Sequence, residues 1–572
     1  MYELLLAVAL GAVALSSFPR EAGGRIARTA IATEVGGAPA VVVAAGSRLT
    51  AFRADGTVVA GFPVTLDEAA AGAPAAGDLD GDGRAELAVV TVTGRLYLWS
   101  GGALVPGFPV KLGPAARAGP SFADVDGDGR PEVLAGDTSG KVHAFKRNKL
   151  EARGWPASVG RPVTTSVSSS NLDGGRAFAF GCEDGRVYVL DAAGKPRKGF
   201  PLLTAFTVSG APAFGDVDDD GDIDLVAASQ DFKVYAVNAA GAPLPGFPVS
   251  AAYRIYEGPA LGDLDGDGRL DVIFASADGQ VHAVSRQGKP LAGFPVQAGV
   301  RVFGGPALAD LDRDGRLDVA VVGADGTVYA FDGRGRELPG FPEPLAANET
   351  TASPLLFDLA RQGAPAVFVG LASGRLHALR VQRVSGQAAA PATDPPAAWP
   401  KPGRDAAQTG RFGPNPPSFK DLVLAPEKPR VTDTLKATWK AVWLDAKAGE
   451  KPPPPRIGWQ RDGKDVPALE GKAAVSPGTV RKGERWRFVL SGASGKTFES
   501  AEVTVADSPP GEATVAIDPP TPSRARSVKA CTAAVNSPKS ELIRIDSCVF
   551  AELPAKEKPI KSIPASMSSA LL

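Results

Sequence analysis

The chain contains few of the residues that cross-link small folds or carry out acid/base chemistry. Only three of its 572 residues are cysteine (Cys182, Cys531 and Cys548), and only three are histidine. Three cysteines exclude a disulfide scaffold or a zinc cluster as the main source of stability. The formal charge is -1, from 62 Lys and Arg against 63 Asp and Glu, so no basic excess argues for a nucleic-acid partner or an anionic membrane.

Long apolar runs are also scarce. The run from Leu4 to Leu15 fits the core of a signal peptide and is too short to span a bilayer. We therefore expect residues 1–23 to be a signal peptide and the mature chain to be exported, to the periplasm, the cell surface or the medium, without a membrane span. Glu3 stands where an export signal normally has a positive charge, which leaves a mis-set start codon or a buried N-terminal strand as alternatives.

After the N-terminal run, the sequence is rich in glycine and proline and contains an internal repeat. The chain has 67 Gly and 51 Pro, which implies many turns. A Gly-Phe-Pro tripeptide, once with Trp for Phe, recurs every 45 to 47 residues and starts at Gly61, Gly107, Gly154, Gly199, Gly246, Gly293 and Gly340. Each period contains four short β-type runs separated by turn residues, and no run reaches helix length. A four-stranded unit with a period in the forties predicts an all-β protein built as a β-propeller.

The ends of the repeat region set the number of blades. Residues 28–63 contain all four runs of a first blade, although their acidic turn is reduced to Glu34. After the seventh tripeptide, residues 352–379 supply three more runs, and Trp399-Pro400 resembles a displaced final strand. We predict eight blades within residues 24–411, with seven blades and an extra hairpin as the alternative.

Five of the eight inter-strand turns share one acidic pattern, in which carboxylates occupy positions 1, 3, 5 and 9 and Gly occupies position 6. Crowded carboxylates repel one another unless a cation is present, and Ca²⁺ takes six to eight oxygen ligands. The pattern predicts about five structural Ca²⁺ sites, whereas solvated Asp-Gly turns are the alternative. The expected ligands are Asp78, Asp80, Asp82 and Glu86; Asp124, Asp126, Asp128 and Glu132; Asp216, Asp218, Asp220 and Asp224; Asp263, Asp265, Asp267 and Asp271; and Asp310, Asp312, Asp314 and Asp318.

An EF-hand does not explain these loops, because position 12 is an apolar residue in all five instead of a bidentate Glu. The three remaining turns have lost most of the acids. They keep Glu34, Asp173 and Asp358, and we expect no metal there.

The acidic loop, the preceding Gly210-Ala211-Pro212 and Phe214-Gly215, and the apolar run that follows resemble the FG-GAP repeats of integrin α-chain propellers and their bacterial relatives, often called VCBS repeats. The resemblance covers roughly residues 25–411. It implies that the ions stiffen loops at one rim and do no chemistry, and that a ligand is met on another surface. The integrin propellers have seven blades, and three turns here lack ligands, so the resemblance concerns architecture more than the ligand.

An enzymatic role has little support in the sequence. His143, His282 and His377 fall at one repeat position, which other blades fill with Tyr, and Cys182 occupies a slot held elsewhere by Thr or Ser. Such positions indicate packing, so we predict a non-catalytic binding, adhesion or surface scaffold protein with a protein or polysaccharide ligand. The alternative is a carbohydrate-active, polysaccharide lyase-like or quinone-dependent propeller enzyme, by analogy of fold alone.

The composition changes after residue 411. A Pro-rich linker at 412–417 precedes alternating runs over 418–508, which are similar to immunoglobulin-like or fibronectin-like β-sandwiches with Trp459 in the core. Residues 509–553 predict a partial second sandwich or a hairpin that places Cys531 opposite Cys548 in a disulfide, with two free thiols as the alternative. Residues 554–572 are rich in Lys, Pro and Ser and predict a flexible tail.

Overall fold

The computed structural model describes residues 12–381, except 300 and 346–349, and most of residues 418–506. The expected linker at 412–417, the disulfide between Cys531 and Cys548, and the segments 509–553 and 554–572 lie outside the described residues. The described residues are almost entirely β-structure, with one short 3₁₀ helix at Pro467–Leu469. They contain no helix with the length and hydropathy of a membrane span.

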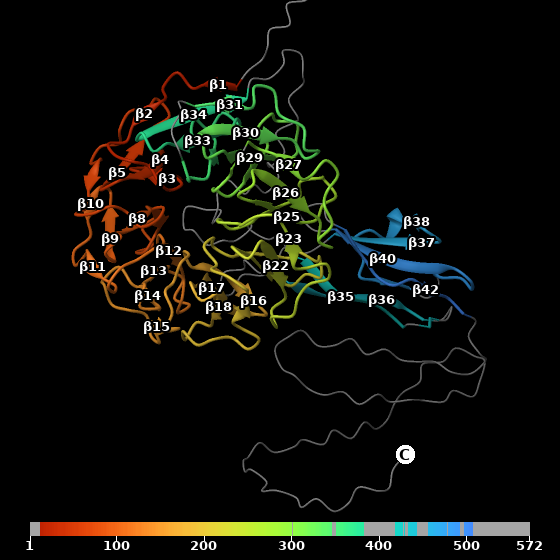
Figure 1. Ribbon diagram of the computed structural model, residues 1–572. Coiled ribbons are helices and arrows are strands. Elements are labelled where there is room, and N and C mark those ends of the chain that lie inside the picture. Colours follow the sequence, from red (N-terminus) through yellow and green to blue (C-terminus); the bar gives the residue numbers. More distant parts are fainter. Residues whose placement is uncertain are drawn as a thin grey trace, which may run out of the picture.

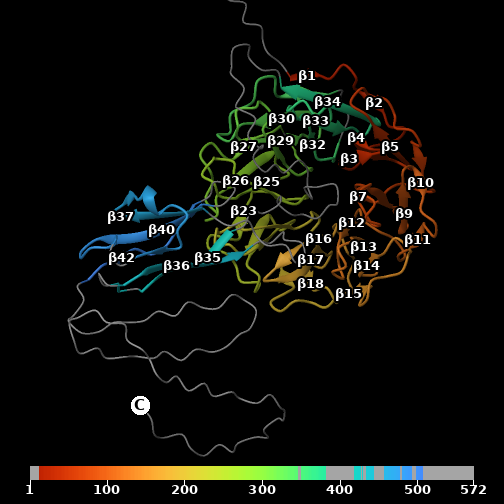
Figure 2. The ribbon, with the colours of Figure 1, turned by 180° about the vertical axis from the view of Figure 1, so that it is seen from behind.

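Eight antiparallel sheets are formed by residues 12–381, and Figures 1 and 2 show them side by side around a ring. We number them from the first complete sheet in the chain. Sheet 1 contains β3 (Ile31–Val35), β4 (Ala38–Ala45), β5 (Arg48–Phe52) and β6 (Val64–Thr65). Sheet 2 contains β7 (Ala75–Gly77), β8 (Glu86–Val90), β9 (Arg95–Ser100), β10 (Ala103–Leu104) and β11 (Val110–Lys111). Sheet 3 contains β12 (Ser121–Ala123), β13 (Glu132–Gly136), β14 (Lys141–Phe145) and β15 (Ala157–Ser158).

The next four sheets repeat the same order. Sheet 4 contains β16 (Ser168–Leu172), β17 (Gly175–Gly181), β18 (Arg186–Leu190) and β19 (Leu202–Leu203). Sheet 5 contains β20 (Ala213–Gly215), β21 (Asp224–Ser229), β22 (Lys233–Val237) and β23 (Val249–Ser250). Sheet 6 contains β24 (Ala260–Gly262), β25 (Asp271–Ala275), β26 (Gln280–Val284) and β27 (Val296–Gln297). Sheet 7 contains β28 (Ala307–Ala309), β29 (Asp318–Val322), β30 (Thr327–Phe331) and β31 (Glu343–Pro344).

Sheet 8 joins the two ends of the repeat region. Its first three strands are β32 (Leu355–Phe357), β33 (Ala366–Gly370) and β34 (Arg375–Val381), and the outer edge of β34 pairs with β1 (Ala12–Ala14) and β2 (Arg20–Glu21). Phe18, between β1 and β2, is 5% exposed and packs edge-on against Phe52 and Phe368. Residues 12–22 therefore lie within the ring, as in the buried-strand alternative, and a cleavage after residue 23 would remove them from it.

The outermost strand of sheet 8 comes from the N-terminal segment. Arg20 pairs with Leu376 of β34 just as Val110 of β11 pairs with Leu96 of β9, so Ser17-Phe18-Pro19 stands where the other sheets carry Gly-Phe-Pro. Trp399-Pro400, which the sequence suggested as a displaced final strand, lies outside the described residues, and within them β1 and β2 occupy the outer edge of β34.

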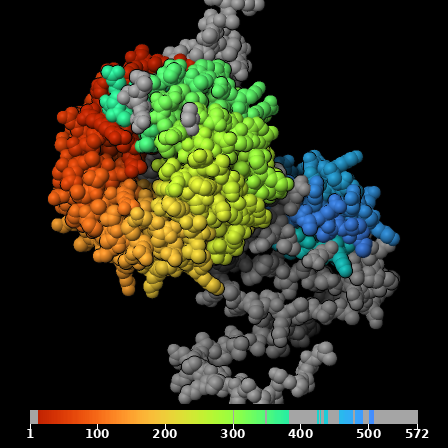
Figure 3. Space-filling view, in the orientation of Figure 1, coloured from red at the N-terminus to blue at the C-terminus, as the bar shows by residue number. Residues whose placement is uncertain are grey.

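The apolar pattern explains why the sheets stack. The second strands β8, β13, β21, β25, β29 and β33 are buried along their whole length, because sheets pack on both of their faces. Each neighbouring pair of sheets shares a buried cluster, and the cluster with Val41, Phe368 and Phe18 joins sheet 1 to sheet 8. The space-filling view shows the first and last sheets in contact (Figure 3).

Glycine is required where the sheets converge on the axis of the ring. A Cβ at Gly210 would lie 1.9 Å from the backbone nitrogen of Gly258, which in the next sheet follows the equivalent residue, Glu257. The Gly before Ala-Pro in the repeat therefore permits the close approach of neighbouring first strands.

The C-terminal described region forms two smaller sheets. One contains β35 (Ser418–Ala425), β36 (Leu435–Val442) and β39 (Ala474–Val475). The other contains β37 (Arg456–Arg461), β38 (Lys464–Asp465), β40 (Arg485–Ser491), β41 (Thr497–Glu499) and β42 (Val503–Thr504). Both sheets contribute to one cluster around Trp459 and Trp486, which are 1% and 0% exposed.

Candidate metal centres

The five acidic loops all connect the first strand of a sheet to the second. In each loop the carboxylates at positions 1, 3 and 9 offer oxygen atoms that lie within 4.8 Å of one another. The five groups are Asp78, Asp80 and Glu86; Asp124, Asp126 and Glu132; Asp216, Asp218 and Asp224; Asp263, Asp265 and Asp271; and Asp310, Asp312 and Asp318. They belong to sheets 2, 3, 5, 6 and 7.

The backbone of each loop holds these carboxylates in place. In the loop of sheet 6, Asp263 accepts hydrogen bonds from the backbone N–H groups of Gly266 and Gly268 at 2.8 and 2.9 Å. Asp271, the first residue of β25, accepts one from the N–H of Leu264 at 2.9 Å. The bond from position 2 to position 9 occurs in all five loops, at 2.7 to 2.9 Å. Since one oxygen of the position-9 acid is used in this way, the other is available to a cation.

The carboxylates at position 5 are placed differently from the other expected ligands. Asp82, Asp128, Asp220, Asp267 and Asp314 are outside the three-residue groups. Each accepts a hydrogen bond from the backbone N–H two residues later, at 2.7 to 2.9 Å. The role of these five acids as ligands stays a prediction.

Burial perturbs the acids at position 9 most. Removal from water raises the pKa of Asp318 to about 9 and that of Asp224 to about 8, and nearby loop carboxylates raise both further. The pKa of Glu132 and that of Asp271 rise to about 7 for the same leading reason. Burial also raises the pKa of Glu86. Without a cation, Asp224 and Asp318 therefore hold protons at neutral pH, so a cation that binds beside them must displace these protons.

The donor set fits a hard divalent ion. All the converging atoms are carboxylate oxygens, and neither a thiolate nor an imidazole joins any of the five groups. Oxygen-only ligands of this kind suit Ca²⁺, Mg²⁺ or Mn²⁺ rather than zinc or copper. In the ligand-poor turn of sheet 8, Arg361 pairs with Glu34 and Asp358 caps its own loop by accepting from Gly363. Among the described residues of this turn, no group of three potential ligands forms.

The residues considered for catalysis lie in packing positions. His143 is 5% exposed, lies parallel to Phe145, and has its Nδ1 2.6 Å from Glu151. His282 stacks on Phe274, and Cys182 is fully buried. A cavity among the starts of the first strands, lined by Arg28, Arg117 and Glu257, has a volume of about 70 Å³, which is room for a few waters and far less than a substrate pocket needs.

Comparison with known families identifies the repeat. Residues 216–274 and 263–321 match the model for the FG-GAP-like repeat, and each match spans two successive acidic loops. The chain contains FG-GAP-like repeats. These repeats and the structural neighbours described next support a repeat β-propeller protein.

Comparison with solved structures found, among others, three that resemble part of this chain, and the likeness to the first of them concerns the fold. Sqt1 of Saccharomyces cerevisiae is 11% identical, with a TM-score of 0.50, over 65% of this chain and 100% of that one. BamB from Moraxella catarrhalis is 17% identical, with a TM-score of 0.45, over 66% of this chain and 99% of that one. The biofilm matrix protein Bap1 of V. cholerae is 13% identical, with a TM-score of 0.44, over 69% and 93%. A search of curated proteins found no significant match. Likeness at these identities concerns fold alone.

Proposed function

We propose that this FG-GAP-like repeat protein is an exported, calcium-stabilised, eight-bladed β-propeller that binds a macromolecular ligand and is not an enzyme. The observation that carries the proposal is the convergence of three carboxylates in the same way in five loops. Ca²⁺ is the hard cation available at millimolar concentration outside cells, and it tolerates the irregular ligand geometry of a loop. The eight sheets with shared clusters support the blade count.

The ions would brace one rim of the ring. Because each acidic loop leads directly into a buried second strand, a cation there fixes the connection between two strands of one blade. With dissociation constants of roughly 0.1 to 1 mM and millimolar Ca²⁺, each site adds about 0.4 to 1.4 kcal/mol to the free energy of unfolding. The summed contribution of several such sites is a large part of the free energy of unfolding of an ordinary domain.

A chelation experiment tests the calcium proposal. We expect EDTA to lower the melting temperature of the full chain by many degrees, and Ca²⁺ but not equimolar Mg²⁺ to restore it. Asp310→Asn in an acidic loop should reduce this calcium-dependent shift, whereas Asp358→Asn in the ligand-poor loop of sheet 8 should leave it unchanged. A melting curve that EDTA does not move would refute the role of calcium.

The opposite rim carries the features expected of a ligand surface. In an antiparallel sheet the turns between the second and third strands, and the connections to the next sheet, lie opposite the acidic loops. The exposed aromatic residues of the described chain, Phe206, Phe232 and Tyr253, are all on this rim, at 47%, 41% and 59% exposure. We call them, together with Arg254, the aromatic loop surface.

Local bonding holds this surface in one shape. The guanidinium of Arg254 lies 4.6 Å from the ring centre of Phe206, and it donates a hydrogen bond to Gln230 at 3.1 Å. Aromatic and arginine side chains that are already fixed are the usual anchors of binding surfaces. A glycan and protein array tests the idea, with Tyr253→Ala expected to lose hits that Val58→Ala, an exposed apolar residue elsewhere, retains. Product formation from a hit would instead favour the enzyme alternative.

A further inference from the structure

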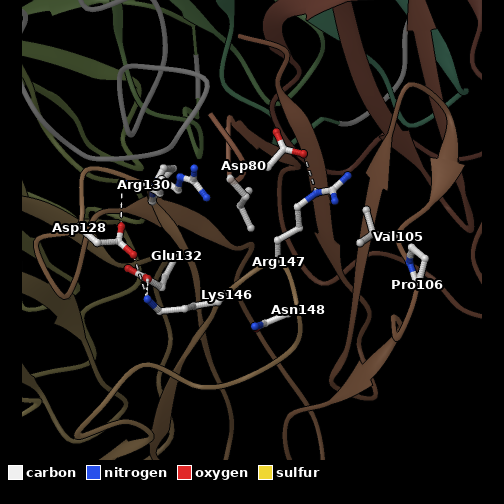
Figure 4. A pocket seen from close by; sticks show the side chains of 11 residues that line it. Asp80, Val105, Pro106, Asp128, Arg130, Glu132, Lys146, Arg147 and Asn148 are labelled. Carbon is white, nitrogen blue, oxygen red and sulfur yellow. Dashed lines mark hydrogen bonds and ion pairs between the residues drawn. The ribbon is translucent and has the colours of Figure 1, made fainter. Parts of the chain in front are cut away.

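The five acidic loops do not have equivalent surroundings, because one turn brings basic side chains to two of them. This turn, residues 146–149, follows β14 in sheet 3. The Nζ of Lys146 lies 2.6 Å from Asp126, 3.0 Å from Asp128 and 3.7 Å from Glu132. Figure 4 shows the ammonium group pointing among the carboxylates of the loop in its own sheet.

The next residue reaches the loop of the neighbouring sheet. The Nε of Arg147 lies 3.0 Å from Asp80 (Figure 4). It lies 3.7 Å from Glu86, and both acids belong to the candidate metal group of sheet 2. Arg176, from β17 of sheet 4, adds a contact at 2.8 Å to Asp124. Basic nitrogens therefore contact all three grouped carboxylates of the sheet 3 loop and two of the three in the sheet 2 loop.

The other three loops lack this arrangement. The repeat position of Lys146 is filled by Asn238 in sheet 5, Ser285 in sheet 6 and Asp332 in sheet 7, none of which is a cation. Arg286 repeats the position of Arg147, but it donates to the backbone carbonyl of Asp218 at 3.0 Å. Arg269 pairs with Asp219 in the sheet 5 loop at 3.3 Å and with the position-5 acid Asp267 of its own loop at 3.5 Å. Among the described residues, no ion pair from Lys or Arg reaches the position-3 or position-9 carboxylates of these loops, which are Asp218, Asp224, Asp265, Asp271, Asp312 and Asp318.

We propose that Lys146 and Arg147 are built-in counterions, so that the loops of sheets 5, 6 and 7 bind Ca²⁺ tightly while those of sheets 2 and 3 admit it only when these side chains are displaced. The inference rests on the proposed calcium function. The carboxylate oxygens that pair with the basic groups are the same ones that would ligate the ion, so the two cations compete. We expect the affinity of the two loops to be roughly tenfold lower, the equivalent of about 1.4 kcal/mol.

Isothermal titration of the EDTA-stripped full chain with CaCl₂ tests this proposal. The wild-type chain should show three tight sites and two weak ones. Lys146→Met combined with Arg147→Met should raise the number of tight sites to five. Lys149→Met is the matched control, because it removes an exposed charge from the same turn that pairs with neither loop, and it should leave three tight sites.

Hydrogen exchange gives a second readout that does not depend on counting heats. Added Ca²⁺ should slow exchange at the starts of β21, β25 and β29 in the wild type, and at β8 and β13 only in the double variant. If the double variant does not fold, Lys146→Gln alone should still add the sheet 3 site. The counterion proposal would be overturned by five equal sites in the wild type. It would also be overturned if the double variant and Lys146→Gln each kept only three tight sites. No calcium binding by any variant would refute the proposed function itself.

Discussion

At the scale of single residues, the buried acid at position 9 ties the loops to pH. Asp318 and Asp224 have pKa values of about 9 and 8, far above the ordinary value near 4 of an exposed Asp in an unfolded chain. At pH values between the unfolded-state pKa and the folded-state pKa, the metal-free folded chain holds protons on these two acids that the unfolded chain has released. Stability from this source is complete below about pH 4 and is lost as the pH rises through the folded-state pKa.

We therefore predict that the metal-free protein becomes less stable between pH 5 and pH 9, and that saturating Ca²⁺ removes most of this loss. Urea unfolding in EDTA at several pH values measures it. Asp318→Asn should flatten the dependence, since the amide cannot titrate. If the stability of the metal-free protein instead rises over this pH interval, in the wild type and in the variant alike, the loss of stability does not come from titration of Asp318.

Phe232 is a second residue with a measurable consequence. It has φ of 72°, whereas the equivalent turns of sheets 2, 3, 4, 6, 7 and 8 place glycine there with φ between 75° and 90°. A bulky side chain in this region costs about 1 to 2 kcal/mol, and such strain is retained most often at functional sites.

We predict that Phe232→Gly stabilises the chain by about 0.5 to 1 kcal/mol, the relieved strain less the extra backbone entropy of glycine. The same variant should weaken binding to any ligand of the aromatic loop surface. Denaturant unfolding and the array experiment measure the two effects. A variant that is less stable than wild type would show that packing of the ring outweighs the strain.

At the scale of secondary-structure elements, the N-terminal strands matter most. Leu15 donates its N–H to Ala378 and Ala22 to Gly374, so backbone bonds from residues 15–22 run along β34. These strands cover the outer edge of β34, which would otherwise be open for pairing with another chain.

Removing residues 1–23 should therefore expose β34 and the Phe18 pocket, and we predict aggregation or a melting temperature lower by at least 10 °C. Phe18→Ala alone should cost about 3 kcal/mol or more. Removal of residues 1–11 is the control and should leave folding intact. If an exported form is sequenced, its N-terminus should precede Ser17. A stable monomer that begins at residue 24 would refute this role.

Because the sequence repeats, most of this architecture could be predicted from it. The features that could not be predicted have physical causes. Gly-Phe-Pro and the acidic loops recur at fixed intervals, so most of the strands could be predicted. The structure also brings the position-1, -3 and -9 acids of each loop together, and their role as metal ligands stays a prediction. Ser17-Phe18-Pro19 was missed because Ser replaces Gly and the preceding apolar run has the length of a signal peptide. The pairing of Lys146 and Arg147 with two different loops depends on tertiary contact between sheets, which spacing along the chain does not reveal.

At the scale of the whole molecule, the number of bound ions sets the net charge. The chain has a formal charge of -1. Three Ca²⁺ ions would add six charges and give +5, and five ions would add ten and give +9. Because Ca²⁺ also displaces protons from buried acids, native electrophoresis should show a shift towards the cathode on adding Ca²⁺, and salt should weaken any resulting attraction to polyanions. Unchanged mobility would contradict cation binding.

The pairing of β1 and β2 with β34 also has a consequence for biosynthesis. The ribosome makes residues 12–21 first, but their partner strand only after some 350 further residues have been added. Seven sheets can assemble as they emerge, whereas sheet 8 must wait for β34, and the early segment stays unpaired until that strand has been made. The ring of sheets therefore closes only after the last repeat has been synthesised.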